Sequence, residues 1–309
     1  MSAPVVVLAG GTGGAKLARG MLDVVGEDLV VVANTGDDVE IYGAYVSPDP
    51  DLVTFWLADR IDARGWGLEG DTFMVMDGLR DLGAEVWFNL GDRDLAVGLE
   101  RARALNAGVR LTDAQATISQ AFGLRARVLP MSDQPVRTRI LAHGRTWPFQ
   151  EFMIKARGAG PIDDYDFRGA RVAGPTPEVL AAVATARTIV IGPSNPIISI
   201  GPILALPGLR EALLESQAPV VAVSPLVHGA VLKGPTAAFM QAAGLSVDTD
   251  GVVAAYAGLI DGLVADERAE SVPVFETQVL MDDTGARRRL AEQTLEFALG
   301  LRRRAEPTE

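Results

Sequence analysis

The sequence predicts an α/β protein in which a mostly parallel β-sheet is flanked by helices. Residues 5–8 and 29–33 are short, continuous apolar runs, typical of strands that are buried on both faces of a parallel sheet. Residues 15–25, between these runs, have helical spacing. Together they form a β-α-β unit, whose crossover should be right-handed.

The same alternation returns in the C-terminal part of the chain. It predicts strands at 188–191, 219–223 and 262–265, and helices at 209–215, 252–263 and 290–302. We therefore expect residues 1–309 to form a single α/β domain.

The middle of the chain has a different pattern. Little strand signal separates four stretches with helical spacing, at 53–60, 72–82, 94–106 and 112–122. This predicts a smaller helical segment, approximately residues 53–123, inserted between two α/β halves. Strands at 125–129 and 137–141 would then return the chain to the sheet.

Composition restricts the classes of partner. The 309 residues carry a net charge of −12, which disfavours a broad electrostatic contact with nucleic acid. No apolar run approaches the roughly 20 residues that span a bilayer, and the N-terminus lacks a basic leader and a cleavage site. Cysteine is absent, which fits a reducing environment. We expect a cytoplasmic protein without membrane or nucleic-acid partners.

The first motif with chemical content runs from Gly10 to Lys16, between the first strand and the first helix. Glycines allow a ligand to approach the backbone, and free amides at a helix start bind anions. The predicted nucleotide-binding residues are Gly11, Thr12, Gly13, Gly14 and Lys16. The spacing fits neither a Walker A loop nor the G-x-G-x-x-G dinucleotide fingerprint. The alternative is a tight turn without a ligand.

Two acidic clusters follow. Asp37 and Asp38 come after the second strand, where open α/β sheets bind their ligands, and Asp49 and Asp51 lie in a Pro-rich stretch shortly afterwards. Clustered carboxylates suit Mg²⁺, which usually bridges phosphate oxygens. We predict these four residues as metal ligands. Ordinary turn chemistry is the alternative, since Asp and Pro are common in loops.

Two further motifs are less specific. In Asn89–Asp94, a glycine precedes alternating charges at a predicted helix start, where Arg93 could bind a phosphate. The alternative is an N-cap by Asp92 with a solvated salt bridge. In the stretch 192–202, two prolines flank Ser194 and Asn195 after a buried strand. This stiff loop could contact a base edge or a phosphate, or be only a proline-rich turn.

These motifs, in this order, resemble the CofD family of 2-phospho-L-lactate transferases, called FbiA in actinobacteria. The resemblance extends over nearly the whole chain and rests on LAGGTGGAK, NTGDD, SPDPD, RGWG, DTF, LGDRD, LPMSDQPV, FQEF and GPSNPIISIGPIL. It implies a Rossmann-like α/β fold with a smaller helical part, usually assembled as a homodimer.

The resemblance also implies a reaction. The family transfers a phospho-acyl group from a guanosine diphosphate-linked donor to the ribityl hydroxyl of the deazaflavin Fo. GMP is released, Mg²⁺ is required, and the product is a precursor of coenzyme F-420. The sequence does not distinguish 2-phospho-L-lactate, phosphoenolpyruvate and 3-phosphoglycerate donors, because they differ by very small groups.

Residue by residue, the resemblance implies that Asp51 and Asn89 contact Fo, and we place Arg93 with them. Asp37 matches a metal ligand, with Asp49 or Asp51 as its partner. The glycine turn with Ser194 and Asn195 matches the guanine-nucleotide side. We expect Asp37 and Asp51 to be catalytic, with Asp51 orienting or deprotonating the hydroxyl.

Two other functions remain open from the sequence. YvcK-like regulators share the GGTG opening and bind nucleotide sugars without known transfer, whereas LGDRD, FQEF and the acidic clusters favour the enzyme. An NAD-dependent oxidoreductase is disfavoured by the broken dinucleotide fingerprint.

Overall fold

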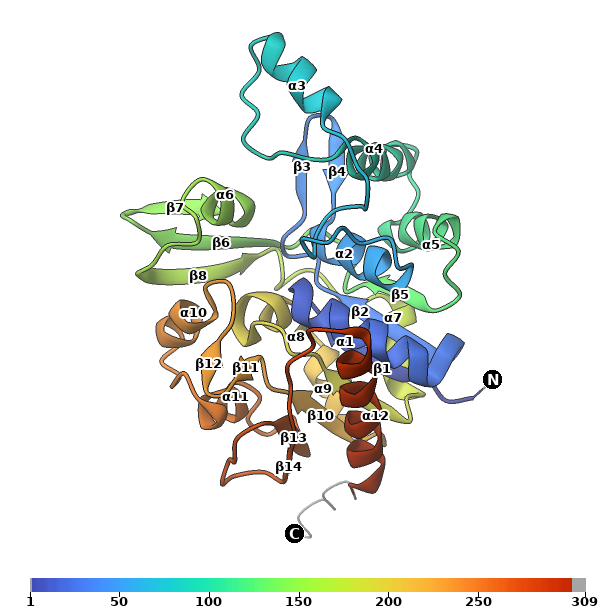
Figure 1. The fold of residues 1–309 in the computed structure, drawn as a ribbon, viewed down its shortest axis with the longest axis vertical. Helices are drawn as coiled ribbons and strands as arrows, with labels where there is room; N and C mark the ends of the chain where they lie inside the picture. The colour runs from blue at the N-terminus through green and yellow to red at the C-terminus, as the bar shows by residue number, and fades with distance from the viewer. Residues whose placement is uncertain (1, 302–309) are drawn as a thin grey trace.

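A seven-stranded, wholly parallel sheet forms the centre of the molecule in a computed structural model that describes residues 2–301 (Figure 1). Its order is β14-β13-β10-β9-β1-β2-β5. The strands are β1 (Val5–Ala9), β2 (Leu29–Ala33), β5 (Arg127–Pro130), β9 (Thr188–Ile191), β10 (Val220–Val223), β13 (Gly262–Ala265) and β14 (Val274–Glu276). The predicted parallel sheet is confirmed, with β14 as an additional edge strand.

Apolar side chains alternate between the two faces of this sheet. In β1, Val6 and Leu8 contribute to one core, whereas Val5 and Val7 contribute to the other. The first core includes α7 (Pro177–Ala184), α8 (Gly201–Leu204), α9 (Leu209–Glu215) and α11 (Thr249–Ala255). The second includes α1 (Gly11–Val25), α2 (Pro48–Leu57) and α12 (Thr284–Gly300). Burial on both faces explains why these strands are continuous apolar runs.

The direction of chain travel reverses between β1 and β9. From β1 the chain passes to β2 and β5 on one side, and then returns to β9, β10 and β13 on the other. In open parallel sheets, ligands bind beyond the carboxyl ends of the strands at such a reversal. The glycine turn after β1 and the loop after β9 meet at this position.

The segment between β2 and β5 contains the predicted helices. They are α2, α3 (Met74–Asp81), α4 (Asp92–Asn106) and α5 (Leu111–Ala121), and α3 lies at the tip of the molecule, remote from the sheet (Figure 1). A hairpin of β3 (Val39–Ile41) and β4 (Ala44–Val46), which the sequence analysis did not predict, precedes them.

The prediction that residues 137–141 rejoin the main sheet is wrong. They form β6 (Arg137–Ala142), the centre of a separate antiparallel sheet with β7 (Arg145–Pro148) and β8 (Ile162–Arg168). His143 and Gly144 both have positive φ and fold β7 back onto β6. The half-buried alternation of β6 suits a sheet with one exposed face. Helices α6 (Phe149–Ile154) and α10 (Thr236–Ala242) pack against this sheet.

The predicted helix at 252–263 is also wrong in its extent. Helix α11 begins at Thr249, where the carboxylate of Asp248 accepts a hydrogen bond from Gly251 N, and it ends at Ala255. Gly258, with φ of +73°, lies in the turn that leads to β13. The predicted helix at 290–302 corresponds to α12, and its last residue, Arg302, lies outside the described residues.

Within residues 2–301, no single helix is long and apolar enough to cross a bilayer. One pair of helical segments in this part of the chain is together long and apolar enough to do so. The pair consists of Pro196–Leu204 and Leu209–Glu215, which are bent by 83° relative to each other.

Candidate active site

The glycine turn forms the start of helix α1. Gly10 is the N-cap residue, and Gly11 has a φ of +63°, a conformation that favours glycine. The first amides of a helix have no acceptor within the helix. Gly10 N donates to Ser194 Oγ at 3.3 Å, and Gly11 N donates to Asp49 Oδ1 at 2.6 Å. The next two backbone amides along the helix are those of Thr12 and Gly13, and Thr12 is exposed.

Close packing explains two of the glycines. A Cβ on Gly13 would overlap the carbonyl oxygen of Pro193, and one on Gly14 would lie 2.6 Å from Ser194 Oγ. The start of α1 therefore packs directly on the loop after β9. Ser194 and Asn195 hold this loop: Ser194 accepts from Gly10 N, and Asn195 Oδ1 accepts from the amides of Ile197 and Ile198.

Lys16 lies one turn after Thr12 on the same face of α1. Its Nζ donates to the carbonyl oxygen of Met281 at 3.0 Å and lies 5.8 Å from the centre of the Trp56 ring. Burial, followed by the positive charges of Arg287 and Lys233, lowers the pKa of Lys16. Three cations are therefore grouped beside the first turns of α1, although Lys16 does not reach the glycine turn itself.

Three predicted metal ligands cluster next to this helix start. Asp37 and Asp38 lie in the loop after β2, and Asp49 lies in the first turn of α2, behind Pro48 at the first helical position. Asp49 Oδ2 accepts from Asn34 Nδ2 at 2.9 Å, and Asp38 Oδ1 accepts from Ser47 Oγ at 2.7 Å. All three carboxylates are buried.

Burial makes the charged form of these groups costly. It raises the pKa of Asp38 to about 7 and that of Asp49 to about 6. Burial and then the charge of Asp49 raise the pKa of Asp37 well above its usual value. Within the described chain, Asp37 Oδ1 and Asp38 Oδ2 are buried without a hydrogen-bond partner. Arg137 and Arg101 lower the pKa of Asp38, but they do not offset the effect of its burial.

A divalent cation fits these unpaired oxygens. In residues 2–301, no group of three or more Asp, Glu or His side chains is arranged to hold a metal on its own. Mg²⁺, however, is commonly held by one or two carboxylates together with substrate phosphates and water. The site therefore suits an ion that arrives with a phosphorylated ligand.

Asp51 has a different environment from the other acidic residues. Both of its oxygens accept hydrogen bonds from Arg101, with Nη1 at 3.0 Å from Oδ2. Arg101 is fully buried on α4, and its Nη2 also donates to Gln115 at 3.2 Å. A buried carboxylate with a bidentate guanidinium is charge-compensated and fixed in orientation.

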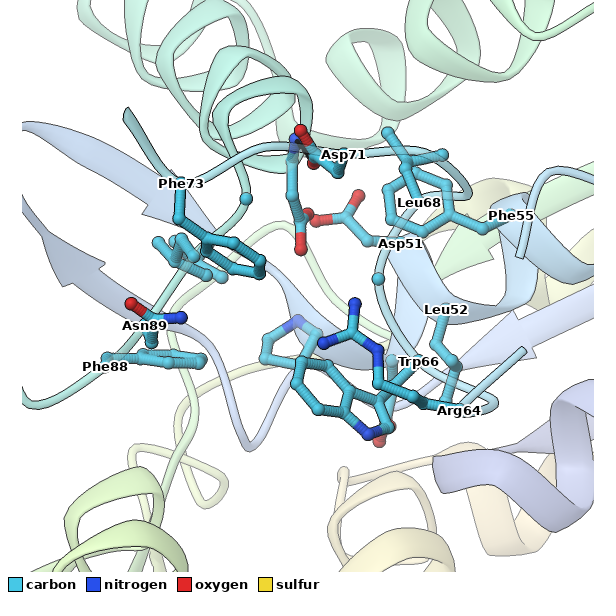
Figure 2. Close-up of a pocket in the computed structure, with 17 residues that line it drawn as sticks. Asp51, Leu52, Phe55, Arg64, Trp66, Leu68, Asp71, Phe73, Phe88 and Asn89 are labelled. Atoms are coloured by element: carbon cyan, nitrogen blue, oxygen red, sulfur yellow. Dashed lines mark hydrogen bonds between the residues drawn. The ribbon is translucent and has the colours of Figure 1, made fainter. Parts of the chain in front are cut away.

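An aromatic cavity of about 180 Å³ opens beside Asp49 and Asp51. Its apolar wall includes Phe55, Trp66, Leu68, Phe73 and Phe88. Figure 2 shows Arg64 lying over Trp66, with the guanidinium carbon 4.3 Å from the ring centre, and Asp51 projecting into the space that the aromatic rings border. Asp71 also lines the cavity. A planar aromatic ligand suits such walls.

The two other predicted acceptor residues lie in different positions. Asn89 lines the cavity, and its Oδ1 accepts from Arg80 at 2.7 Å. Arg93 is exposed on the first turn of α4, does not line the cavity, and points Nη1 toward the Glu69 carbonyl at 3.4 Å. The cavity therefore gathers Asp49, Asp51 and Asn89, but not Arg93.

Reciprocal helix caps hold residues 64–73, the cavity loop, in place. The carboxylate of Asp71 accepts from the amides of Arg93 and Asp94 at the start of α4. In return, the carboxylate of Asp92 accepts from the amides of Met74 and Val75 at the start of α3. Negative charge at a helix N-terminus is stabilising, and these caps account for Asp71 of the DTF motif and Asp92 of the LGDRD motif.

The sequence analysis missed three features of this cavity: Arg101 behind Asp51, Asp94 in the lining, and the rings that form the wall. One signal for the first two was available. Asp94, Gly98 and Arg101 recur at helical spacing, so they share one face of α4. An added Cβ on Gly98 would lie 3.0 Å from Ala44 Cβ, which shows how closely this face packs on β4.

A family model described as 2-phospho-L-lactate transferase CofD matches residues 5–295. This chain belongs to the CofD family. The 2-phospho-L-lactate transferase of Methanosarcina mazei is 42% identical over 265 residues, which cover 85% of this chain and 87% of that protein. The phosphoenolpyruvate transferase of Kitasatospora aureofaciens is 36% identical and covers 95% of this chain and 97% of its own. The CofD relatives are transferases, and the chain is a transferase of this family.

A solved structure from Bacillus halodurans, a member of the UPF0052 family, shares the CofD fold. It superposes with a TM-score of 0.61 at 16% identity and covers 96% of this chain and 99% of its own. At this identity the likeness concerns the fold alone.

Proposed function

We propose that this enzyme transfers a phospho-acyl group from a guanosine diphosphate-linked donor to the ribityl hydroxyl of the deazaflavin Fo and releases GMP. The product would be a precursor of coenzyme F-420. One observation carries the proposal: Asp49 both lines the aromatic cavity and binds the amide of Gly11 at the helix start. A planar acceptor in the cavity and a phosphate at α1 would therefore meet at this residue.

On the donor side, the diphosphate would bind at the N-terminus of α1. The amides of Thr12 and Gly13 supply hydrogen-bond donors and positive potential there, and Lys16 lies one turn further on. Asp37 and Asp38, which carry unpaired buried oxygens, would hold Mg²⁺ together with donor oxygens, with Asp49 beside them. When bound, the ion would neutralise negative charge on the leaving phosphate. Ser194 and Asn195 would support the nucleotide by fixing the loop after β9.

On the acceptor side, Trp66, Phe73 and Phe88 would stack on the deazaflavin ring, and Asn89 would bind its polar edge. We assign Asp51 to orientation of the acceptor, because Arg101 already occupies both of its oxygens. Arg93 is left with a surface role in this proposal. The homodimer, which the family resemblance implies, and the cytoplasmic location, which the composition suggests, stay predictions.

The relatives of this chain differ in the phospho-acid for which they are named. The relatives from Methanocaldococcus jannaschii and K. aureofaciens are both 36% identical to this chain, yet one is named for 2-phospho-L-lactate and the other for phosphoenolpyruvate. We propose one of these phospho-acids or 3-phosphoglycerate as the transferred group.

Mass analysis of the product tests the proposal. The enzyme is incubated with Mg²⁺, Fo and each of the three guanylylated donors in turn, and one donor should give a phosphodiester of Fo together with GMP. Chelation of Mg²⁺ should stop the reaction, and added Mg²⁺ should restore it. Fluorescence titration should show Fo binding without a donor. No product with any donor, combined with no Fo binding, would favour a nucleotide-binding regulator instead.

A further inference from the structure

Four carboxylates face the aromatic cavity, and three of them are already engaged. Asp49 accepts from Gly11 and Asn34, and Asp51 accepts from Arg101. Asp71 caps the start of α4. The fourth, Asp94, accepts no hydrogen bond on its carboxylate from any residue in the described part of the chain.

Asp94 lies where a ligand in the cavity could donate the hydrogen bonds that the protein does not supply. It lies in the first turn of α4, one face of which continues through Gly98 to Arg101, and it is only partly exposed. Arg101 is the nearest cation along this face, but its guanidinium forks onto Asp51 instead. Asp94 thus presents unsatisfied acceptors to the cavity, and a ligand with hydroxyl groups can supply the missing donors.

The charges around Asp94 come from three directions. Burial and then the negative charges of Asp51 on α2 and Asp71 on the cavity loop raise the pKa of Asp94 to about 7, while Arg101 opposes them. A carboxyl group with a pKa near neutrality can accept a proton during a reaction and lose it again afterwards. Asp94 is therefore suited to proton transfer as well as to hydrogen bonding.

We propose that Asp94 is a catalytic residue that binds the reacting hydroxyl of the acceptor and accepts its proton. The inference rests on the proposed transferase function. In the step, the hydroxyl oxygen attacks the phosphorus that carries the acid, and its O–H bond breaks as the new P–O bond forms. The P–O bond to the nucleotide breaks, and GMP leaves with the bridging oxygen and its electron pair. The proton remains on the Asp94 carboxylate.

This assignment separates two roles that the sequence analysis combined in Asp51. The Asp51 carboxylate is immobilised by Arg101 and orients the chain that carries the hydroxyl. Asp94 carries out the proton transfer. Both residues line one cavity, so a single acceptor molecule can contact both.

The test compares Asp94→Asn with the wild-type enzyme. Asparagine keeps the size and a hydrogen-bond acceptor, but it does not take up the proton. We expect kcat to fall by about 100-fold or more, with the acceptor KM within about threefold of wild type. The limb of the pH–rate profile near neutrality should disappear. Glu100→Gln, the same change of charge on the exposed side of α4, should leave all three quantities unchanged.

Asp94→Ser removes the carboxyl without adding volume and serves if Asp94→Asn does not fold. Fo binding by fluorescence shows whether either variant retains an intact cavity. An unchanged kcat in a variant that binds Fo would overturn the assignment, as would a raised acceptor KM with an unchanged kcat. If the wild-type enzyme forms no product from Fo and any donor, the proposed function fails first, and this inference fails with it.

Discussion

Two parts of the proposed site differ in how they are built, although they meet at Asp49. We call the start of α1 with the loop after β9 the donor edge, and the aromatic cavity the acceptor cavity. At the donor edge, backbone packs on backbone: the start of α1 rests on the loop after β9, with glycines where any Cβ would collide. In the cavity, side chains from α2 and from the chain around residues 64–73 and 88–91 form the walls, and Trp66 keeps 51% of its surface exposed. One half is rigid because of its packing, whereas the other depends on a few side-chain contacts.

This difference suits two kinds of ligand. A diphosphate needs fixed amides, because electrostatic stabilisation is strongest when the donors do not have to reorganise. A planar acceptor needs area and shape, which side chains can adjust. We therefore expect substitutions at the donor edge to change folding, and substitutions in the cavity to change acceptor binding.

The largest expected effect is on folding, from Gly13→Ala. The new Cβ would overlap the Pro193 carbonyl oxygen, and neither backbone can move without disturbing β1 or β9. Overpacking of this kind should lower the free energy of unfolding by about 3 kcal/mol, measured by urea denaturation.

The same substitution on the cavity side provides the matched control. Gly78 lies within α3, has an ordinary φ, and an added Cβ would meet no heavy atom within 4 Å. Gly78→Ala should therefore stabilise the protein by about 0.5 to 1 kcal/mol, because alanine favours the helix. Equal, small effects at both positions would contradict the contrast between the two regions.

The same contrast separates what the sequence predicted from what it missed. A strand that is buried on both faces is a continuous apolar run in the sequence. For this reason β1, β2, β9 and β10 were predictable. The alternation of apolar and polar residues in β6 does not show whether the strand joins the main sheet or a hairpin. The turn at His143 and Gly144 decides for the hairpin.

For the site, the proximity of Asp37, Asp38 and Asp49 was predictable, because Asp37 and Asp38 follow β2 and Asp49 begins α2 at the same edge of the sheet. The spacing places Arg101 on the same face as Asp94, but its burial was not predictable, since a charged residue in a helix is normally exposed. Its burial depends on Asp51, which lies 50 positions away in the chain. Asp94 was inside a recognised motif, but only the cavity distinguishes it from Asp92.

The second effect concerns buried charge at the donor edge. The pKa of Asp38 is raised to about 7 in the folded protein, against an unfolded value near 3.9. Between these values the folded protein binds more protons than the unfolded chain, so its free energy of unfolding falls as the pH rises through about 7. Without divalent cations, the protein should be less stable at about pH 8 than at about pH 5.5.

Asp38→Asn should remove part of this slope and stabilise the metal-free protein at about pH 8 by on the order of 2 kcal/mol. Urea denaturation at both pH values measures it, and Asp81→Asn, an exposed carboxylate on α3, is the control. If stability rose with pH over this range in the wild type, the buried carboxylates would have to be compensated in a way that their hydrogen bonds do not indicate.

The smallest effect on stability should come from the cavity, through Trp66→Ala. Because the Trp66 ring is half exposed, its loss should change the free energy of unfolding by less than about 0.5 kcal/mol. Stacking on an aromatic ligand contributes about 1 to 3 kcal/mol, so the acceptor KM should rise by about tenfold. Trp147→Ala is the control, since Trp147 also carries a stacked arginine, Arg145, at 3.5 Å but lies outside the cavity wall. An equal rise in acceptor KM for both variants would mean that Trp66 acts through general loss of structure. The cavity wall would then not bind the acceptor through the Trp66 side chain.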